Sequence, residues 1–474
     1  GSEMCIRDRN ISWGITASAE ETGAGTESGT QTWKEDNLTW TLSADGTTMT
    51  ISGSGAMKNY ITDDSPATQK KDNVKKVVIE DGVTSIGDFA FFYCSSLTSI
   101  EIPESVISIG NNTFEHCSSL TNITIPGSVT SIGMSAFSDC SSLASITIPE
   151  SVTSIGNYAF YNCTGLTSIT IPKSVTSIGN GMFKYCTGLT SITIPKSVTS
   201  IGSNVFGGCT VLTEVLLENG STLTSGQLGV DASKIATYWN EDNLTWTLTA
   251  DGTMTISGSG AMKDYSYDSP ACDNSNIKKV VIEEDVTSIG DSAFSDCRSL
   301  TDITIPGSVT SIGESAFSGT PWLTNKRQEN SSLVIVNGIL IDGTTCSGEV
   351  TIPDGVTSIG KSAFKECSSM TSISIPKSVT SIGDSAFLGC SSLTDITIPG
   401  SVTSIGDSAF FECAELTSIN IPDGVTSIGN SAFYDCSSMT SINIPKSVTS
   451  IEKFAFYKCT GLTLSLIHIS EPTR

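Results

Sequence analysis

Apolar and polar residues follow one another in a phrase that returns every 23 residues through most of this chain. In one copy, residues 168–171 read Ser-Ile-Thr-Ile, with an apolar side chain at every second position. This alternation predicts a short strand that buries Ile169 and Ile171 on one side. Pro172 comes next and should end the strand, because proline has no N–H to donate to a sheet.

The second half of the phrase predicts another strand and a turn. Val175 and Ile178 are expected to point inward from a second extended stretch. We expect Gly179 to adopt a turn conformation with positive φ, although Glu452 occupies the equivalent position in the last copy. A short helical turn should follow, in which a phenylalanine and, three positions later, a cysteine face the core.

Phenylalanine marks 13 copies of the phrase, six from Phe91 to Phe206 and seven from Phe294 to Phe456. One copy is too small to bury its own apolar residues, so neighbouring copies must stack and share a core. The repeats therefore predict a mainly β solenoid of stacked rungs, with coupling between neighbouring rungs and caps at the ends.

Two further segments are near copies of each other and precede the repeats. They are Trp33–Glu80 and Trp239–Glu283. In each, alternating apolar residues flank an Asp-Gly pair, which predicts a β-hairpin. We therefore expect two tandem arrays, each preceded by a β-hairpin cap.

The expected ranges follow from these boundaries. They are cap 1 at 33–76, array 1 at 77–217, a linker or closing cap at 218–238, cap 2 at 239–279 and array 2 at 280–463. Inside array 2 the unit 318–350 is irregular. Val334–Ile341, with Asn-Gly at its centre, predicts a two-residue hairpin there.

Both ends depart from the repeat. We interpret residues 1–10 and 464–474 as translated sequencing-adapter sequence, and we expect the chain to be truncated at both ends. Residues 11–32 contain Ala-Ser-Ala at 17–19, followed by acidic and Gly/Ser/Thr-rich residues. This pattern is typical of a signal-peptide remnant with a disordered spacer, so we expect the protein to be secreted.

The core of the phrase, L-x-x-I-x-I-P at Leu166, Ile169, Ile171 and Pro172 with Phe-x-x-Cys before it, resembles a leucine-rich repeat. The full phrase I-P-x-S-V-T-S-I-G-x-x-A-F-x-x-C is similar to the BspA-like class of bacterial surface proteins, and the caps resemble modules that precede such arrays in gut Firmicutes. The resemblance implies a right-handed leucine-rich repeat superhelix, strands on its concave side, and adhesion to host matrix or to other cells. Proline stands near the position of the family's asparagine ladder, which leaves the hydrogen bonding at that corner open.

Composition narrows the classes of function. The net charge of −24 repels phosphate backbones, so no nucleic-acid partner is expected. No apolar run reaches the ~18 residues of a membrane span. The protein contains only two histidines, so we expect no catalytic triad, no metal site and no cofactor, and we interpret the chain as a non-enzyme. His116 falls at a variable position and is expected to be exposed.

Cysteine fills its position in 12 of the 13 copies, with Thr320 as the exception. Identical positions one rung apart give parallel side chains, which rarely meet the torsion that a disulfide needs. We therefore predict a column of buried free thiols.

The outward positions of the first strand are the candidate binding residues. In array 1 they are Ser99, Glu101, Asn122, Thr124, Ser145, Thr147, Ser168, Thr170, Ser191 and Thr193. In array 2 they include Asp302, Thr304, Ser372, Ser374, Asp395, Thr397, Ser418, Asn420, Ser441 and Asn443.

These positions predict a continuous face of small polar residues, which also fits a solvated sheet surface with no ligand. The leading hypothesis is adhesion to an extracellular protein or glycan of unknown identity through low-affinity, multivalent contacts. One alternative is a structural stalk that presents another domain and has no ligand of its own. Another is a surface that binds ice or crystals through its regular threonine rows.

Overall fold

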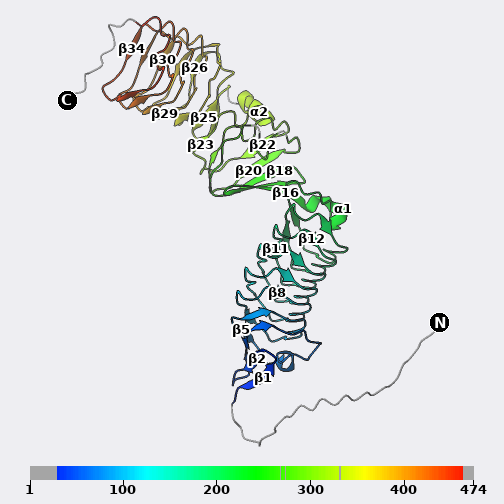
Figure 1. The fold of residues 1–474 in the computed structure, drawn as a ribbon. Helices are drawn as coiled ribbons and strands as arrows, with labels where there is room; N and C mark the ends of the chain where they lie inside the picture. Colours follow the sequence, from blue (N-terminus) through cyan, green and yellow to red (C-terminus); the bar gives the residue numbers. More distant parts are fainter. Residues whose placement is uncertain (1–28, 267, 273, 330–331, 463–474) are drawn as a thin grey trace, which may run out of the picture.

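The chain forms an elongated coil of stacked rungs with a bend near its middle (Figure 1). This computed structural model describes residues 29–462, apart from 267, 273, 330 and 331. The expectations for 1–10, for 464–474 and for most of 11–32 concern residues outside this part of the chain. The expected β solenoid is confirmed, and the helices are few and short.

Most rungs contribute a strand to a first column, in which each strand pairs in parallel with the equivalent strand of the neighbouring rung. The strands of this column are β5 (Lys76–Ile79), β7 (Ser99–Glu101), β11 (Ser168–Thr170), β13 (Ser191–Ile194), β15 (Glu214–Glu218), β20 (Lys279–Ile282), β22 (Asp302–Thr304), β26 (Gly348–Thr351), β28 (Met370–Ser374), β30 (Asp395–Thr397), β32 (Ser418–Asn420) and β34 (Ser441–Asn443). Between β7 and β11, a single bridge joins Thr124 to Thr147. The expected inward isoleucines, such as Ile169 and Ile171, are buried.

A second column of shorter strands follows the proline corner. It comprises β4 (Gly55–Ala56), β6 (Val83–Ser85), β8 (Ser108–Ile109), β9 (Ser131–Ile132), β10 (Ser154–Ile155), β12 (Ser177–Ile178), β14 (Ser200–Ile201), β19 (Gly260–Ala261), β21 (Val286–Ile289), β23 (Ser311–Ile312), β27 (Ser358–Ile359), β29 (Ser381–Ile382), β31 (Ser404–Ile405), β33 (Ser427–Ile428) and β35 (Ser450–Ile451). Val175 and Ile178 are buried as predicted.

Hydrogen bonds close the corner that proline occupies. The N–H of Val175 donates to the carbonyl of Pro172 at 3.1 Å, and the same turn recurs from rung to rung. Serine side chains tie neighbouring corners together, as where Ser197 Oγ donates to the carbonyl of Val175 at 2.9 Å. An asparagine and aspartate ladder does exist, but it lies after the glycine, where the N–H of Asn180 donates to Asn157 Oδ1 at 2.8 Å. The hydrogen bonding that the sequence left open is therefore satisfied at both corners.

The prediction for Gly179 was wrong, because its φ is not positive. Glycine is needed there because the previous rung lies too close for a side chain. A Cβ on Gly179 would stand 2.7 Å from Asn157 Oδ1, and one on Gly156 only 2.4 Å from the backbone nitrogen of Met134. Positive φ falls instead on two later residues of the rung, such as Tyr158 and Asn162.

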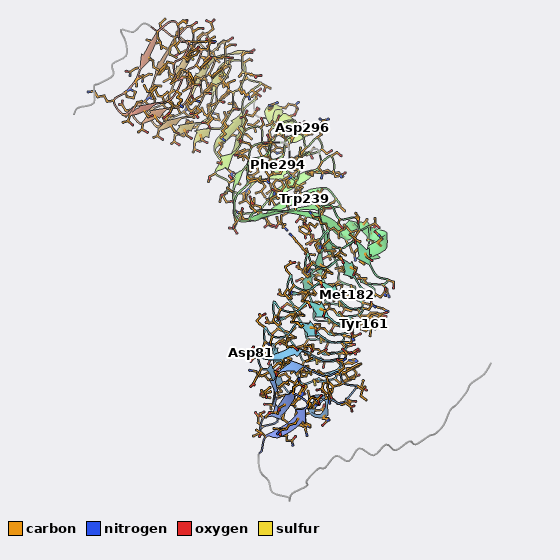
Figure 2. The ribbon with its side chains drawn as sticks, viewed as in Figure 1. Asp81, Tyr161, Met182, Trp239, Phe294 and Asp296 are labelled. Carbon is orange, nitrogen blue, oxygen red and sulfur yellow. The ribbon has the colours of Figure 1, made fainter. Side chains whose placement is uncertain are left out.

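The segment expected as a short helical turn is a run of tight turns in each rung. In one copy, the N–H of Tyr161 donates to the carbonyl of Tyr158, and that of Leu166 donates to Cys163. The left-handed residues between these turns interrupt any helix. We call the outer side of these segments the turn face; Tyr161 lies on it, on the side of the coil away from Asp81 (Figure 2).

Phenylalanine and cysteine face the core as predicted. Neighbouring phenylalanines stack almost in parallel, with ring centroids 5.5 Å apart between Phe137 and Phe160. The thiols reach the turn of the preceding rung, as where Cys163 Sγ donates to the carbonyl of Phe137 at 3.0 Å. Burial raises the pKa of Cys186 to about 12. A thiol that stays protonated at neutral pH is a poor nucleophile, so these cysteines serve packing.

Both caps form the predicted hairpins and close the core beside the first rung. Cap 1 contains β1 (Gln31–Glu35), β2 (Leu38–Leu42), β3 (Thr48–Gly53) and the 3-10 helix Thr68–Lys70, and cap 2 contains β16 (Ile235–Glu241), β17 (Leu244–Thr249) and β18 (Thr253–Gly258). Trp40 is fully buried in cap 1 and packs 5.7 Å from Phe91, while Trp246 in cap 2 packs 5.4 Å from Phe294. Each cap therefore adds a buried tryptophan to the start of the phenylalanine column that follows it.

The two arrays share one sheet across the bend. β15 pairs in parallel with β16, which pairs with β17, so one sheet runs from array 1 through cap 2 into array 2. Helix α1 (Ser225–Leu228) and the 3-10 helix Ala232–Lys234 lie between β15 and β16. The buried apolar side chains do not form one cluster here, because those of array 1 end at Leu228 and those of cap 2 begin at Leu244. The backbone connection is therefore continuous where the core is interrupted.

The irregular unit of array 2 contains helix α2 (Pro321–Glu329) and the predicted hairpin of β24 (Val334–Val336) and β25 (Ile339–Asp342). Asn337 and Gly338 both have positive φ, as the two-residue turn requires. Trp322 of α2 packs 4.7 Å from Phe317, and the phenylalanine column resumes only at Phe364.

Candidate functional site

The outward side chains of the first strand column form a surface that we call the strand face. All twenty residues predicted for it are exposed or half-buried, and none is buried. Parallel pairing sets equivalent residues side by side, so that Ser168 neighbours Ser191 and Thr170 neighbours Thr193. In array 2, Asn443 Nδ2 donates to Asn420 Oδ1 at 2.5 Å. The face therefore presents rows of hydroxyl and amide groups.

The strand face is hollowed where array 1 meets cap 2. The hollow has a volume of about 300 Å³. Thr170 and Thr193 form part of its floor, and the other lining residues are Glu150, Ile171, Lys173, Pro195, Leu216, Tyr238, Asn240, Thr245 and Thr247. Of the twenty predicted residues, these two threonines are the ones that the structure places in this concave site.

Cap 2 supplies the wall of this hollow because its hairpin is longer than the strands of the rungs. β16 has seven residues, against three in β11, and its register pairs Tyr238 with Thr247 and Asn240 with Thr245. Tyr238 is 7% exposed, and burial together with the nearby Glu218 raises its pKa to about 12. The phenol thus stays protonated at neutral pH, and the hollow offers hydroxyl and amide groups for hydrogen bonding.

Sequence reasoning missed the residues of cap 2 that line this hollow. Asn240, Thr245 and Thr247 lie in a hairpin that the sequence presents only as a cap. Tyr238 lies in the segment 218–238 that was expected as a linker or closing cap, although strand β16 already begins at Ile235. The order of the segments could have indicated the hollow. Cap 2 follows array 1 in the chain, so its hairpin must lie beside the strand face of array 1. Cap 1 has no described rung before it.

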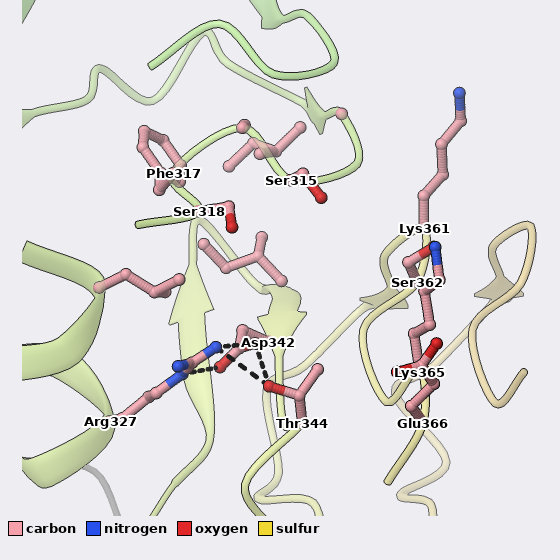
Figure 3. A pocket seen from close by; sticks show the side chains of 15 residues that line it. Ser315, Phe317, Ser318, Arg327, Asp342, Thr344, Lys361, Ser362, Lys365 and Glu366 are labelled. Atoms are coloured by element: carbon pink, nitrogen blue, oxygen red, sulfur yellow. Dashed lines mark hydrogen bonds and ion pairs between the residues drawn. The ribbon is translucent and has the colours of Figure 1, made fainter. Parts of the chain in front are cut away.

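A second hollow, of about 470 Å³, opens on the turn face beside the irregular unit (Figure 3). Arg327 from α2 reaches Asp342 with two hydrogen bonds of 2.6 and 2.8 Å, and it also donates to Thr344 at 3.0 Å. Lys365 pairs with Glu314 at 2.9 Å across the same gap. These charges are neutralised within the hollow, so they hold the irregular unit in place.

His116 is half-buried, although the sequence predicted an exposed position. Its ring packs 4.1 Å from that of Tyr93, and Nδ1 lies 3.9 Å from Asp139 Oδ2. In the described part of the chain, no hydrogen bond joins a serine hydroxyl to this imidazole, so the nucleophile–base pair of a hydrolase is missing there. Among the described helices, none has the length and apolar character needed to cross a bilayer.

A coil of 23-residue rungs with a strand face and a phenylalanine column defines a leucine-rich repeat protein. More specifically, the chain belongs to the family described as the BspA type leucine rich repeat region. The family profile matches residues 65–190, 130–228, 266–340 and 342–463.

Among solved structures, the chain is similar to a leucine-rich repeat protein from Eubacterium ventriosum ATCC 27560, with 24% identity over 94% of this chain and 98% of that chain and a TM-score of 0.30. It is also similar to a leucine rich cell surface protein from Faecalibacterium prausnitzii A2-165, with 27% identity over 87% of this chain and 94% of that chain and a TM-score of 0.34. No curated protein matches the sequence.

Proposed function

We propose that this protein is a secreted or cell-surface repeat protein that binds an extracellular protein or glycan through its strand face, with the hollow beside cap 2 at the centre of the contact. The observation that carries the proposal is this hollow, because it is a concave part of the predicted face in which hydroxyl and amide groups lie among apolar side chains. Repeated threonines on either side would add weak contacts to the same ligand.

Chemistry of the lining favours a neutral or weakly basic ligand. The chain carries a net charge of −24, and Glu150 and Lys173 are the charged residues of the hollow. Hydroxyl groups in rows suit the hydroxyls of a glycan or the backbone of an extended peptide. A strongly acidic ligand would be repelled by the protein as a whole.

Binding is tested with the full chain on immobilised matrix proteins and on a glycan array. The face variant replaces Thr124, Thr147, Thr170 and Thr193 with lysine. A matched control replaces the residues six positions later in the same four rungs with lysine; these are exposed and directly precede strands of the second column, namely Thr130, Thr153, Thr176 and Thr199.

We expect the wild type and the control variant to bind the same immobilised ligands. We expect the face variant not to bind them. Both variants change the net charge by the same amount, so a difference between them reports position and not charge. Retention of the face variant would contradict the proposal. Failure of the wild type to bind any member of either panel would favour a stalk that presents another domain.

A further inference from the structure

We propose that Glu115, His116 and Asp139 form a binding site for a divalent transition-metal ion on the turn face of array 1, and that Zn²⁺ is the ion that the site suits. The three residues come from two neighbouring rungs and are all half-buried. The site is separate from the strand face and does not depend on the function proposed for it.

The donor atoms already lie close to binding distance. One oxygen of Glu115, a ring nitrogen of His116 and one oxygen of Asp139 are all within 4.8 Å of one another. Bonds of about 2.1 Å to a tetrahedral Zn²⁺ place two donor atoms about 3.4 Å apart. His116 Nδ1 and Asp139 Oδ2 are 3.9 Å apart, which is slightly longer than this separation. The three donor atoms must therefore move closer together by side-chain rotation when the ion binds.

Backbone geometry holds the two rungs in this register. His116 and Asp139 occupy the same position in consecutive rungs, and both have left-handed φ, of 63° and 60°. The N–H of His116 donates to the carbonyl of Ser138 at 2.9 Å, which fixes one rung against the other beside the site. The ligands are therefore positioned before any ion arrives, which lowers the ordering cost of binding.

Neighbouring side chains orient the ligands in the way that metal sites require. Asn162 Nδ2 donates to Asp139 Oδ1 at 2.6 Å, and Ser138 Oγ donates to Asp139 Oδ2 at 2.8 Å. Asn112 donates to the carboxylate of Glu115. The ring of Tyr93 packs against the imidazole of His116. Each ligand is thus held by a partner that is not itself a ligand.

The ligand set selects the class of ion. One imidazole and two carboxylates suit Zn²⁺ and its neighbours in the first transition row. Calcium requires six to eight oxygen ligands, which three side chains do not supply. Three protein ligands leave one tetrahedral position for water or for a donor from another molecule. Sequence reasoning expected no metal because the chain has only two histidines. It did not group these three residues, because Asp139 stands one full repeat beyond His116 and the coil brings them together.

Titration of the full chain with Zn²⁺ in a calorimeter tests the site. The site variants are Glu115→Ser, His116→Asn and Asp139→Asn, and each introduces a residue found at the same position of another rung. They therefore fit the turn, and circular dichroism should show unchanged folding. We expect one Zn²⁺ per chain and at least a 100-fold loss of affinity in His116→Asn and Asp139→Asn. Asp435→Asn, at the same position in array 2, should bind as wild type does.

Asn162→Ala tests the positioning role. Loss of a residue that orients a ligand typically lowers metal affinity about 10–100-fold. We expect a loss in that range, with one ion still bound. Unchanged affinity in this variant would contradict the assigned orientation of Asp139.

Cobalt substitution distinguishes this site from cysteines and from His468, which lies outside the described residues. Co²⁺ bound by nitrogen and oxygen gives weak visible bands without the intense near-ultraviolet band of a thiolate complex. We expect these weak bands in wild type and in His468→Ala, and their loss in His116→Asn. A thiolate band, equal Zn²⁺ affinity in wild type and site variants, or binding that requires His468 would overturn the proposal.

Discussion

Single residues in this coil are constrained mainly by the rung next to them. The glycine that follows the second strand is the clearest case, because its neighbour is the backbone of the previous rung. The sequence shows that glycine is favoured at this position, but not whether positive φ or close approach is the reason. The prediction of positive φ was wrong because close approach is the reason. The left-handed positions were equally hard to predict, since tyrosine, asparagine and serine occupy them in different rungs.

Gly156→Ala should lower the free energy of unfolding by about 1–3 kcal/mol, as expected for overpacking. The new Cβ would stand 2.4 Å from the nitrogen of Met134, so the two rungs must separate. Urea denaturation of the full chain measures the change. Ser154→Ala, at an exposed position of the same rung, is the control and should leave the urea midpoint unchanged. An unchanged midpoint in Gly156→Ala would show that glycine is dispensable there.

At the scale of elements, the irregular unit joins two apolar clusters through charged contacts. Buried residues of the cap 2 cluster extend to Ile339, and those of the following cluster begin at Leu333. Two ion pairs cross the same junction, Lys365 with Glu314 at 2.9 Å and Lys361 with Asp291 at 3.8 Å. The Asn-Gly pair correctly predicted the hairpin. The two ion pairs could not be predicted from the sequence, because they join residues of different rungs.

Lys365→Met should weaken this junction by up to about 1 kcal/mol, the range of a partly exposed ion pair. Burial alone would raise the pKa of Glu314, but the hydrogen bond and the positive charge of Lys365 outweigh it and lower that pKa. A lowered pKa in the folded state contributes stability above the unfolded value of about 4.3 and loses it as the pH falls further.

Hydrogen exchange at residues 339–367 measures the opening of this junction. The wild type should open more readily in 1 M salt, which screens the pair. This salt dependence should be smaller in Lys365→Met, which keeps the longer pair of Lys361 with Asp291. Lys377→Met, an exposed position in the next rung, is the control. Equal salt dependence in wild type and Lys365→Met would contradict the role assigned to the pair.

At the scale of the whole molecule, repetition made the fold predictable. Thirteen phenylalanine-marked copies show which positions are apolar, so the stacked rungs, both caps and the outward residues of the strand face follow from the sequence. The hollow beside cap 2 did not follow, because it depends on how one hairpin meets the neighbouring array. The grouping of Glu115, His116 and Asp139 also required the coil, which brings together residues one repeat apart.

The central claim is that each rung is stabilised by its immediate neighbours within one coil. Hydrogen exchange of the full chain carrying Phe160→Ala tests it most directly, since truncating this buried ring should cost about 3–5 kcal/mol. We predict that protection falls most in the rungs of Phe137 and Phe183, fades with distance along array 1, and is unchanged in residues 339–462. Uniform loss of protection along the whole chain would contradict the account.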